Sequence, residues 1–92
     1  MTAGYRPCRT GLHVCGADHD RGEFFTQANM PLRDAAAARR LFEAARAELA
    51  CSDGEPRDFV VDLFIAGECS TDFDITRQML PRLERLYRTA LS

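Results

Sequence analysis

The feature that most constrains the fold is an amphipathic stretch at residues 32–50, LRDAAAARRLFEAARAELA. Its apolar side chains recur at spacings of three and four residues, as on one face of an α-helix: Ala35, Ala38, Leu41, Phe42, Ala45 and Leu49. Pro31 fits the first turn of this helix, and Gly54 and Pro56 fit its end. Because the apolar face is rich in alanine, the helix can lie close to a sheet.

Three other segments have the composition of β-strands. Residues 11–17, GLHVCGA, alternate in side-chain character with the period of a half-buried strand. Residues 23–29, EFFTQAN, contain aromatic and threonine side chains, so these two segments predict a hairpin with a loop of four or five residues. Residues 58–67, DFVVDLFIAG, are apolar on both faces except at Asp62, which is typical of a central strand.

A second helical stripe runs from residue 74 towards the C-terminus, with apolar positions at Ile75, Met79, Leu83, Leu86 and Ala90. Asp74 or Thr71 fits its N-cap. Pro81 lies inside the stripe, where a proline removes a backbone hydrogen bond at a cost of about 3 kcal/mol. Either the helix kinks at Pro81, or it begins later and residues 75–80 form a separate turn. The continuous stripe favours the kink.

These elements predict a single α+β domain over residues 1–92, in the order β-β-α-β-α, with residues 1–10 mobile. A right-handed crossover makes the third strand parallel to the second, which gives a mixed three-stranded sheet with both helices packed on one face. The other face is expected to be thinly covered, and the side chains expected to emerge there are Phe24 or Phe25, Val60 and Phe64.

The composition is that of an ordinary folded domain, with 46% hydrophobic and 28% charged residues in 92. No apolar run approaches the roughly 18 residues of a membrane span, and the first residues lack the apolar core of a secretion signal. We therefore expect a cytoplasmic protein that does not contact membranes. In that compartment the four cysteines, at positions 8, 15, 51 and 69, are expected to be reduced.

The segment CRTGLHVCGADHDRG, at 8–22, contains four potential zinc ligands, Cys8, His13, Cys15 and His19. Their spacing lacks the two-residue knuckle that holds a pair of thiolates, so ordinary side chains of a hairpin are the simpler interpretation. A Cys/His nucleophilic pair needs direct contact, which same-face neighbours on one strand do not make. A metal- or thiol-dependent module built on this cluster is retained as an alternative, and no cofactor is predicted.

Charge is distributed unevenly along the chain. Residues 53–74 carry seven acidic side chains against Arg57 alone, a local net of −6, whereas residues 75–92 carry four arginines against Glu84, a local net of +3. Glu68, Asp72 and Asp74 could hold a hard cation, but they lack the pattern of a calcium loop, and helix capping explains them more simply. Since the sequence also lacks a phosphate loop and the common hydrolase motifs, we expect no enzymatic activity.

The remaining prediction is a small protein that binds another protein. The acidic segment would dock on a basic partner surface and occlude it, as in inhibitors of the immunity or anti-CRISPR type from bacteria or phage. No direct nucleic-acid binding is expected, and a structural homodimer without catalytic activity is a further alternative. The predicted partner-binding residues are Glu68, Asp72, Asp74, Asp58, Phe25 and Phe64.

Overall fold

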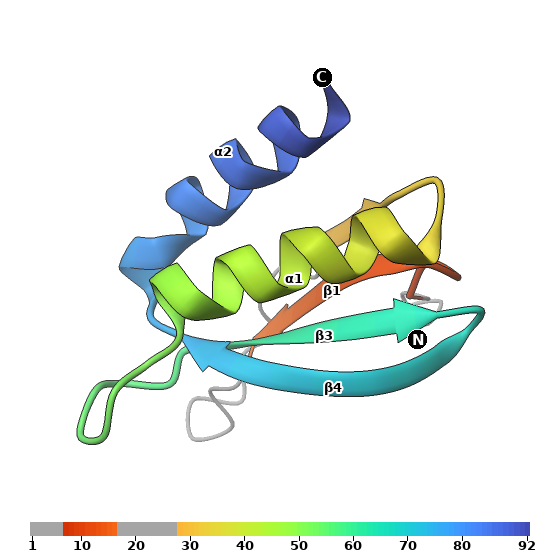
Figure 1. Ribbon diagram of the computed structural model, residues 1–92. Helices are drawn as coiled ribbons and strands as arrows, with labels where there is room; N and C mark the ends of the chain where they lie inside the picture. Colours follow the sequence, from red (N-terminus) through yellow and green to blue (C-terminus); the bar gives the residue numbers. More distant parts are fainter. Residues whose placement is uncertain (1–6, 17–27) are drawn as a thin grey trace, which may run out of the picture.

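The computed structural model describes residues 7–16 and 28–92, which form an α+β domain with a four-stranded antiparallel sheet and two helices (Figure 1). The elements in chain order are β1 (Gly11–Gly16), β2 (Ala28–Pro31), α1 (Ala35–Leu49), β3 (Phe59–Ile65), β4 (Glu68–Ile75), the 3₁₀ turn η1 (Arg77–Met79) and α2 (Leu80–Leu91). No helix among these elements is long and apolar enough to cross a membrane.

The strand order is β2-β1-β3-β4, and every neighbouring pair is antiparallel. The predicted three-stranded mixed sheet is therefore wrong in both strand number and strand direction. β3 does run in the same direction as β2, as expected, but β1 lies between them and pairs with both. The central position predicted for the third strand is confirmed, because β3 is hydrogen-bonded to β1 on one side and to β4 on the other.

The strand missing from the prediction is β4, which follows β3 through a tight turn at Ala66 and Gly67. Both turn residues have positive φ angles, 52° and 86°, a combination that matches the right-handed twist of the two flanking strands. The predicted strand over 58–67 therefore ends at Ile65, and the acidic residues 68–74 belong to a strand rather than to a capping loop. A register irregularity opposite Leu63 and Phe64 marks a β-bulge.

The first predicted helix is confirmed, with a later start. Asp34 is its N-cap, and its Oδ1 accepts a hydrogen bond from the backbone N–H of Ala37 at 2.8 Å. Pro31 is the last residue of β2 rather than part of the first helical turn. The helix ends with Ala50 as its C-cap, so Gly54, at a φ of 89°, lies in the following turn and does not cap it.

The last helix begins at Leu80, which places Pro81 in its first turn. A proline is well tolerated there, because the first N–H groups of a helix have no partner inside the helix. The predicted kink at Pro81 is wrong, and the later start is correct: Ile75 ends β4, and the turn η1 separates the strand from the helix. Thr71 and Asp74 are consequently strand residues and not N-caps.

The hydrophobic core lies between the helices and one face of the sheet, on the side where Figure 1 shows α1 and α2. Its centre includes Phe42 of α1, whose ring lies 5.1 Å from that of Phe73 of β4, centroid to centroid. Leu83 is the fully buried residue of α2. The core comprises Leu12, Val14, Met30, Ala38, Leu41, Phe42, Ala45, Leu49, Phe59, Val61, Leu63, Phe73, Ile75 and Leu83.

The start of β1 is fixed by close backbone contacts. Gly11 has a φ of 143°, and a side chain there would overlap the carbonyl oxygen of Met30. The backbone N–H of Gly67 donates to the carbonyl of Arg9 at 2.7 Å, and that of Ala66 donates to Oγ1 of Thr10 at 3.1 Å. These bonds tie the segment before β1 to the β3–β4 turn. The predicted hairpin loop, most of the predicted strand over 23–29, and Phe24 lie outside the described residues.

Candidate interaction surface

The face of the sheet opposite the helices collects most of the polar side chains of the strands. Since side chains alternate between the two faces of a strand, residues between core positions point to this side, which we call the open face. Its described members are His13, Cys15, Asn29, Val60, Asp62, Phe64, Cys69, Asp72 and Asp74.

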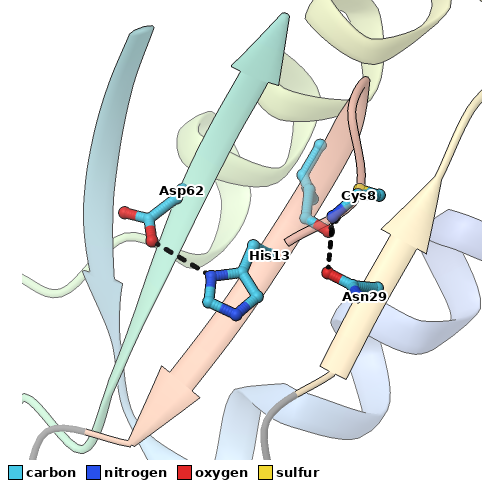
Figure 2. A network of polar contacts seen from close by, with 5 residues as sticks. Cys8, His13, Asn29 and Asp62 are labelled. Atoms are coloured by element: carbon cyan, nitrogen blue, oxygen red, sulfur yellow. Dashed lines mark hydrogen bonds and ion pairs between the residues drawn. The ribbon is translucent and has the colours of Figure 1, made fainter. Parts of the chain in front are cut away.

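A row of polar residues crosses the open face from one edge of the sheet to the other. Strand register places Asn29 opposite His13, His13 opposite Asp62, and Asp62 opposite Asp72. Figure 2 shows His13 and Asp62 pointing towards each other, with Nδ1 and Oδ2 3.4 Å apart. At the β2 end, Oδ1 of Asn29 accepts a hydrogen bond from the backbone N–H of Cys8 at 3.0 Å.

His13 is buried although it lies on the open face, with an exposed fraction of 7%. The ring of Phe64 packs against it edge to face, with 6.0 Å between ring centroids and an angle of 84° between ring planes. Phe64, predicted as a partner-binding residue, is therefore half-buried and engaged with His13 in this structure.

Asp62 is the least solvated carboxylate of the row, and its burial raises the pKa of this group above its usual value. Contact with His13 opposes the increase, whereas the neighbouring carboxylate of Asp72 adds to it. Like charges directly opposite each other on paired strands are destabilising. This part of the open face therefore places two carboxylates side by side, with His13 in contact with one of them.

We call Asp62, Asp72 and Asp74 the acidic surface. Asp72 has no ion-pair or hydrogen-bond partner among the described residues, and Oδ2 of Asp74 lies 3.5 Å from Nη1 of Arg57. The Arg57 side chain is 63% exposed, so solvent screens this pair strongly. Among residues 7–16 and 28–92, the basic side chains that lie near these three carboxylates are the solvated Arg57 and His13.

The other predicted partner-binding residues lie elsewhere. Glu68 is opposite Ile65, which packs against the core, so Glu68 points to the helix side of the sheet. Oδ2 of Asp58 accepts a hydrogen bond from the backbone N–H of Arg77 at 2.7 Å, which ties the start of β3 to the turn η1. Phe25 lies outside the described residues. Of the predicted set, the open face contains Phe64, Asp72 and Asp74.

Asp62 is the member of the acidic surface that was not among the predicted partner-binding residues. Its role depends on a neighbour across the strand pair, Asp72, and that neighbour is set by the β3–β4 register. The alternation of Thr71, Phe73 and Ile75 with acidic residues is the signal that could have revealed β4.

The Cys/His cluster is only partly described, because His19 lies outside the described residues. Within the described part, no group of three or more potential metal ligands comes together. Burial raises the pKa of the Cys8 and Cys15 thiols, and the charge of Asp62 adds to the increase at Cys15. Higher thiol pKa values disfavour the thiolate, which is the nucleophile and the metal ligand. The described surroundings of Cys8 and Cys15 therefore disfavour the thiolate form of both.

A groove of about 350 Å³ lies on the helix side, between the β1–β2 pair and α2. Its walls are largely apolar and include Val14, Met30 and Leu80, with Arg77 and Glu84 also lining it. The guanidinium of Arg77 lies over the ring of Phe59, 5.8 Å from its centroid. None of the described side chains that line the groove is a cysteine, serine or histidine.

The comparisons with known proteins give no relative, since no protein-family model, curated protein or solved structure matches this chain.

Proposed function

We propose that this protein binds another protein through the acidic surface, and that it acts as an inhibitor by occluding a basic surface of its partner. The observation that carries the proposal is the set of three carboxylates on the open face, Asp62, Asp72 and Asp74, with a solvated arginine 3.5 Å from one of them. Neither helix covers this face (Figure 1).

The electrostatics of the free protein support a basic partner. Burial raises the pKa of Asp62, and the charge of Asp72 across the strand pair adds to the increase. A lysine or arginine placed between them would relieve this repulsion and would make charge-assisted hydrogen bonds. Long-range attraction between the acidic surface and a basic partner would also accelerate association.

The test compares two variants with the same change in net charge. The double variant Asp72→Asn/Asp74→Asn removes two charges from the acidic surface. The double variant Glu43→Gln/Glu48→Gln removes two exposed charges from α1, where the glutamates pair with Arg46 and Arg82. The partner is captured by cross-linking in the native host, purified, and used to measure association rates at low salt and at about 0.15 M, where the screening length is about 8 Å.

We expect the aspartate variant to associate about tenfold more slowly than the parent at low salt, with a smaller difference at the higher salt concentration. The glutamate variant should remain close to the parent in both conditions. Circular dichroism confirms that both variants are folded. An unchanged association rate for a folded aspartate variant would exclude docking through the acidic surface.

A further inference from the structure

β4 is an edge strand whose outer side is largely open. The backbone N–H of Cys51 donates to the carbonyl of Asp74 at 2.8 Å, so the peptide groups of Asp74 point away from β3. Outward- and inward-pointing residues alternate along an antiparallel strand, so the N–H and C=O of Asp72 point outwards as well. Among the described residues, Cys51 is the one backbone partner on this side of β4.

The open edge is long and exposed. β4 has eight residues, more than any other described strand, and residues 68–72 are exposed. It forms one edge of the sheet (Figure 1). Edge strands are commonly protected from further pairing by proline, lysine or a bulge. β4 contains no proline, and its bulge is at Ser70, between the partners of Phe64 and Leu63, so the regular part of the edge begins at Thr71, directly before Asp72. Within the part of the chain that the structure describes, no strand pairs with the outward backbone groups of Asp72, so they are available to an additional strand.

The same two residues of β4, Asp72 and Asp74, provide both outward-pointing backbone groups and carboxylates of the acidic surface. Asp72 and Asp74 each direct their peptide groups to the open edge and their side chains to the open face. In an added antiparallel strand, a residue directly opposite Asp72 would exchange both backbone hydrogen bonds with it and would place its side chain on the open face. A basic side chain at that position would lie beside the Asp72 carboxylate.

We propose that the partner docks by strand addition, and that an extended basic segment pairs antiparallel with β4 around Asp72 as a fifth strand. This inference rests on the proposed function, and it specifies both the docking mode and the pattern of the bound segment, in which basic residues alternate with apolar or neutral ones. A second copy of β4 fits this edge poorly, because its own aspartates would face Asp72 and Asp74. The basic segment is favoured by charge complementarity.

The test uses synthetic peptides of about nine residues, a common strand length, that alternate arginine with valine. One peptide is unmodified, one is N-methylated at the arginine amides and one is N-methylated at the valine amides. The proposed pairing directs the arginine amides towards β4, so methylation there should weaken binding about tenfold or more, whereas methylation of the valine amides should have little effect. Binding is followed by titration into ¹⁵N-labelled protein, and hydrogen exchange should show that the unmodified peptide protects the Asp72 amide.

Two variants of β4, each lacking one negative charge, test whether peptide binding depends on the face of the sheet to which the charge points. Asp72→Asn should weaken binding of the unmodified peptide, whereas Glu68→Gln, on the same strand but directed to the helix side, should not. Equal binding by the two methylated peptides, or a loss caused by the valine methyl groups alone, would overturn the antiparallel pairing. Protection of Asp72 in a dimer without peptide would overturn the choice of occupant.

The two proposals fail in different ways. In one outcome, all three peptides bind in a way that depends on salt and on Asp72 but leaves the Asp72 amide unprotected from hydrogen exchange. That result would overturn strand addition, while docking through the acidic surface would stand. Unchanged partner association for Asp72→Asn/Asp74→Asn would overturn the proposed function itself. No peptide binding at low salt would overturn strand addition, and the rate measurements with the captured partner would still decide the function.

Discussion

Substitution of Leu83 by alanine tests how the last helix is anchored. Leu83 is completely buried, and it is the residue that α2 contributes to the centre of the core. Removing three carbon atoms at about 0.8 kcal/mol each predicts a loss of about 2.4 kcal/mol from transfer alone. Because the surrounding core relaxes only partly, the residual cavity should bring the total loss in unfolding free energy to about 3–5 kcal/mol.

A loss of this size is large for a domain of 92 residues, whose total stability is expected to be about 5–14 kcal/mol. It should lower the Tm by about 12 °C or more, at about 4–8 °C per kcal/mol. The assay is urea denaturation followed by circular dichroism, with a thermal scan as the second measurement. The α-helical signal should remain close to that of the parent before unfolding begins.

Leu91→Ala provides the matched control, because it makes the same change on the same helix at a side chain that is 57% exposed. Its effect should be within about 0.5 kcal/mol of zero. If Leu83→Ala lowered the unfolding free energy by less than about 1 kcal/mol, or no more than Leu91→Ala does, α2 would not be anchored through Leu83 and the described core would be wrong.

Two further predictions concern the open face. Burial raises the pKa of Asp62 above 3.8, so the folded protein binds a proton at this carboxylate more tightly than the unfolded chain does. The ionised Asp62 therefore destabilises the folded state. This destabilisation is complete above the raised pKa and disappears as the pH falls through the raised pKa towards 3.8. Urea denaturation should therefore show that Asp62→Asn gains more unfolding free energy relative to the parent at about pH 7 than at about pH 3, and an equal difference at both pH values would contradict the raised pKa. The purified protein should contain no stoichiometric zinc, because ligand spacing and the raised pKa of the Cys15 thiol both disfavour a thiolate site. One zinc per chain by elemental analysis, lost in Cys15→Ser, would establish the metal site.

The elements predicted correctly from sequence are those whose pattern is local. The helix at 35–49 follows from an apolar repeat that extends over four turns, and the strand at 59–65 follows from a continuous apolar run. The end of that strand was misplaced because Ala66 adopts a positive φ, which alanine seldom does and which no common turn signal announces. Without that turn, the acids after Gly67 resembled a capping loop rather than a returning strand.

The open face depends on the same missing element. Asp72 and Asp74 were selected from charge alone, but Asp62 joins them only because β4 folds back beside β3 in the observed register. Glu68 was selected with them, yet the bulge and the register place it opposite Ile65, on the other face. A shift of one residue in pairing exchanges the two faces of a strand, so charge along the chain does not specify charge on a surface.

The sequence by itself determined that this chain forms a single small α+β unit with an amphipathic helix, a buried strand and a concentration of acidic residues in its second half, because hydrophobic period and composition act locally. The tertiary structure decided the number and order of the strands, the start of the last helix at Leu80, and the position of β4 at an open edge with its aspartates beside Asp62. Those features depend on which strands pair and in what register, and pairing is determined by burial of the whole core rather than by any one segment.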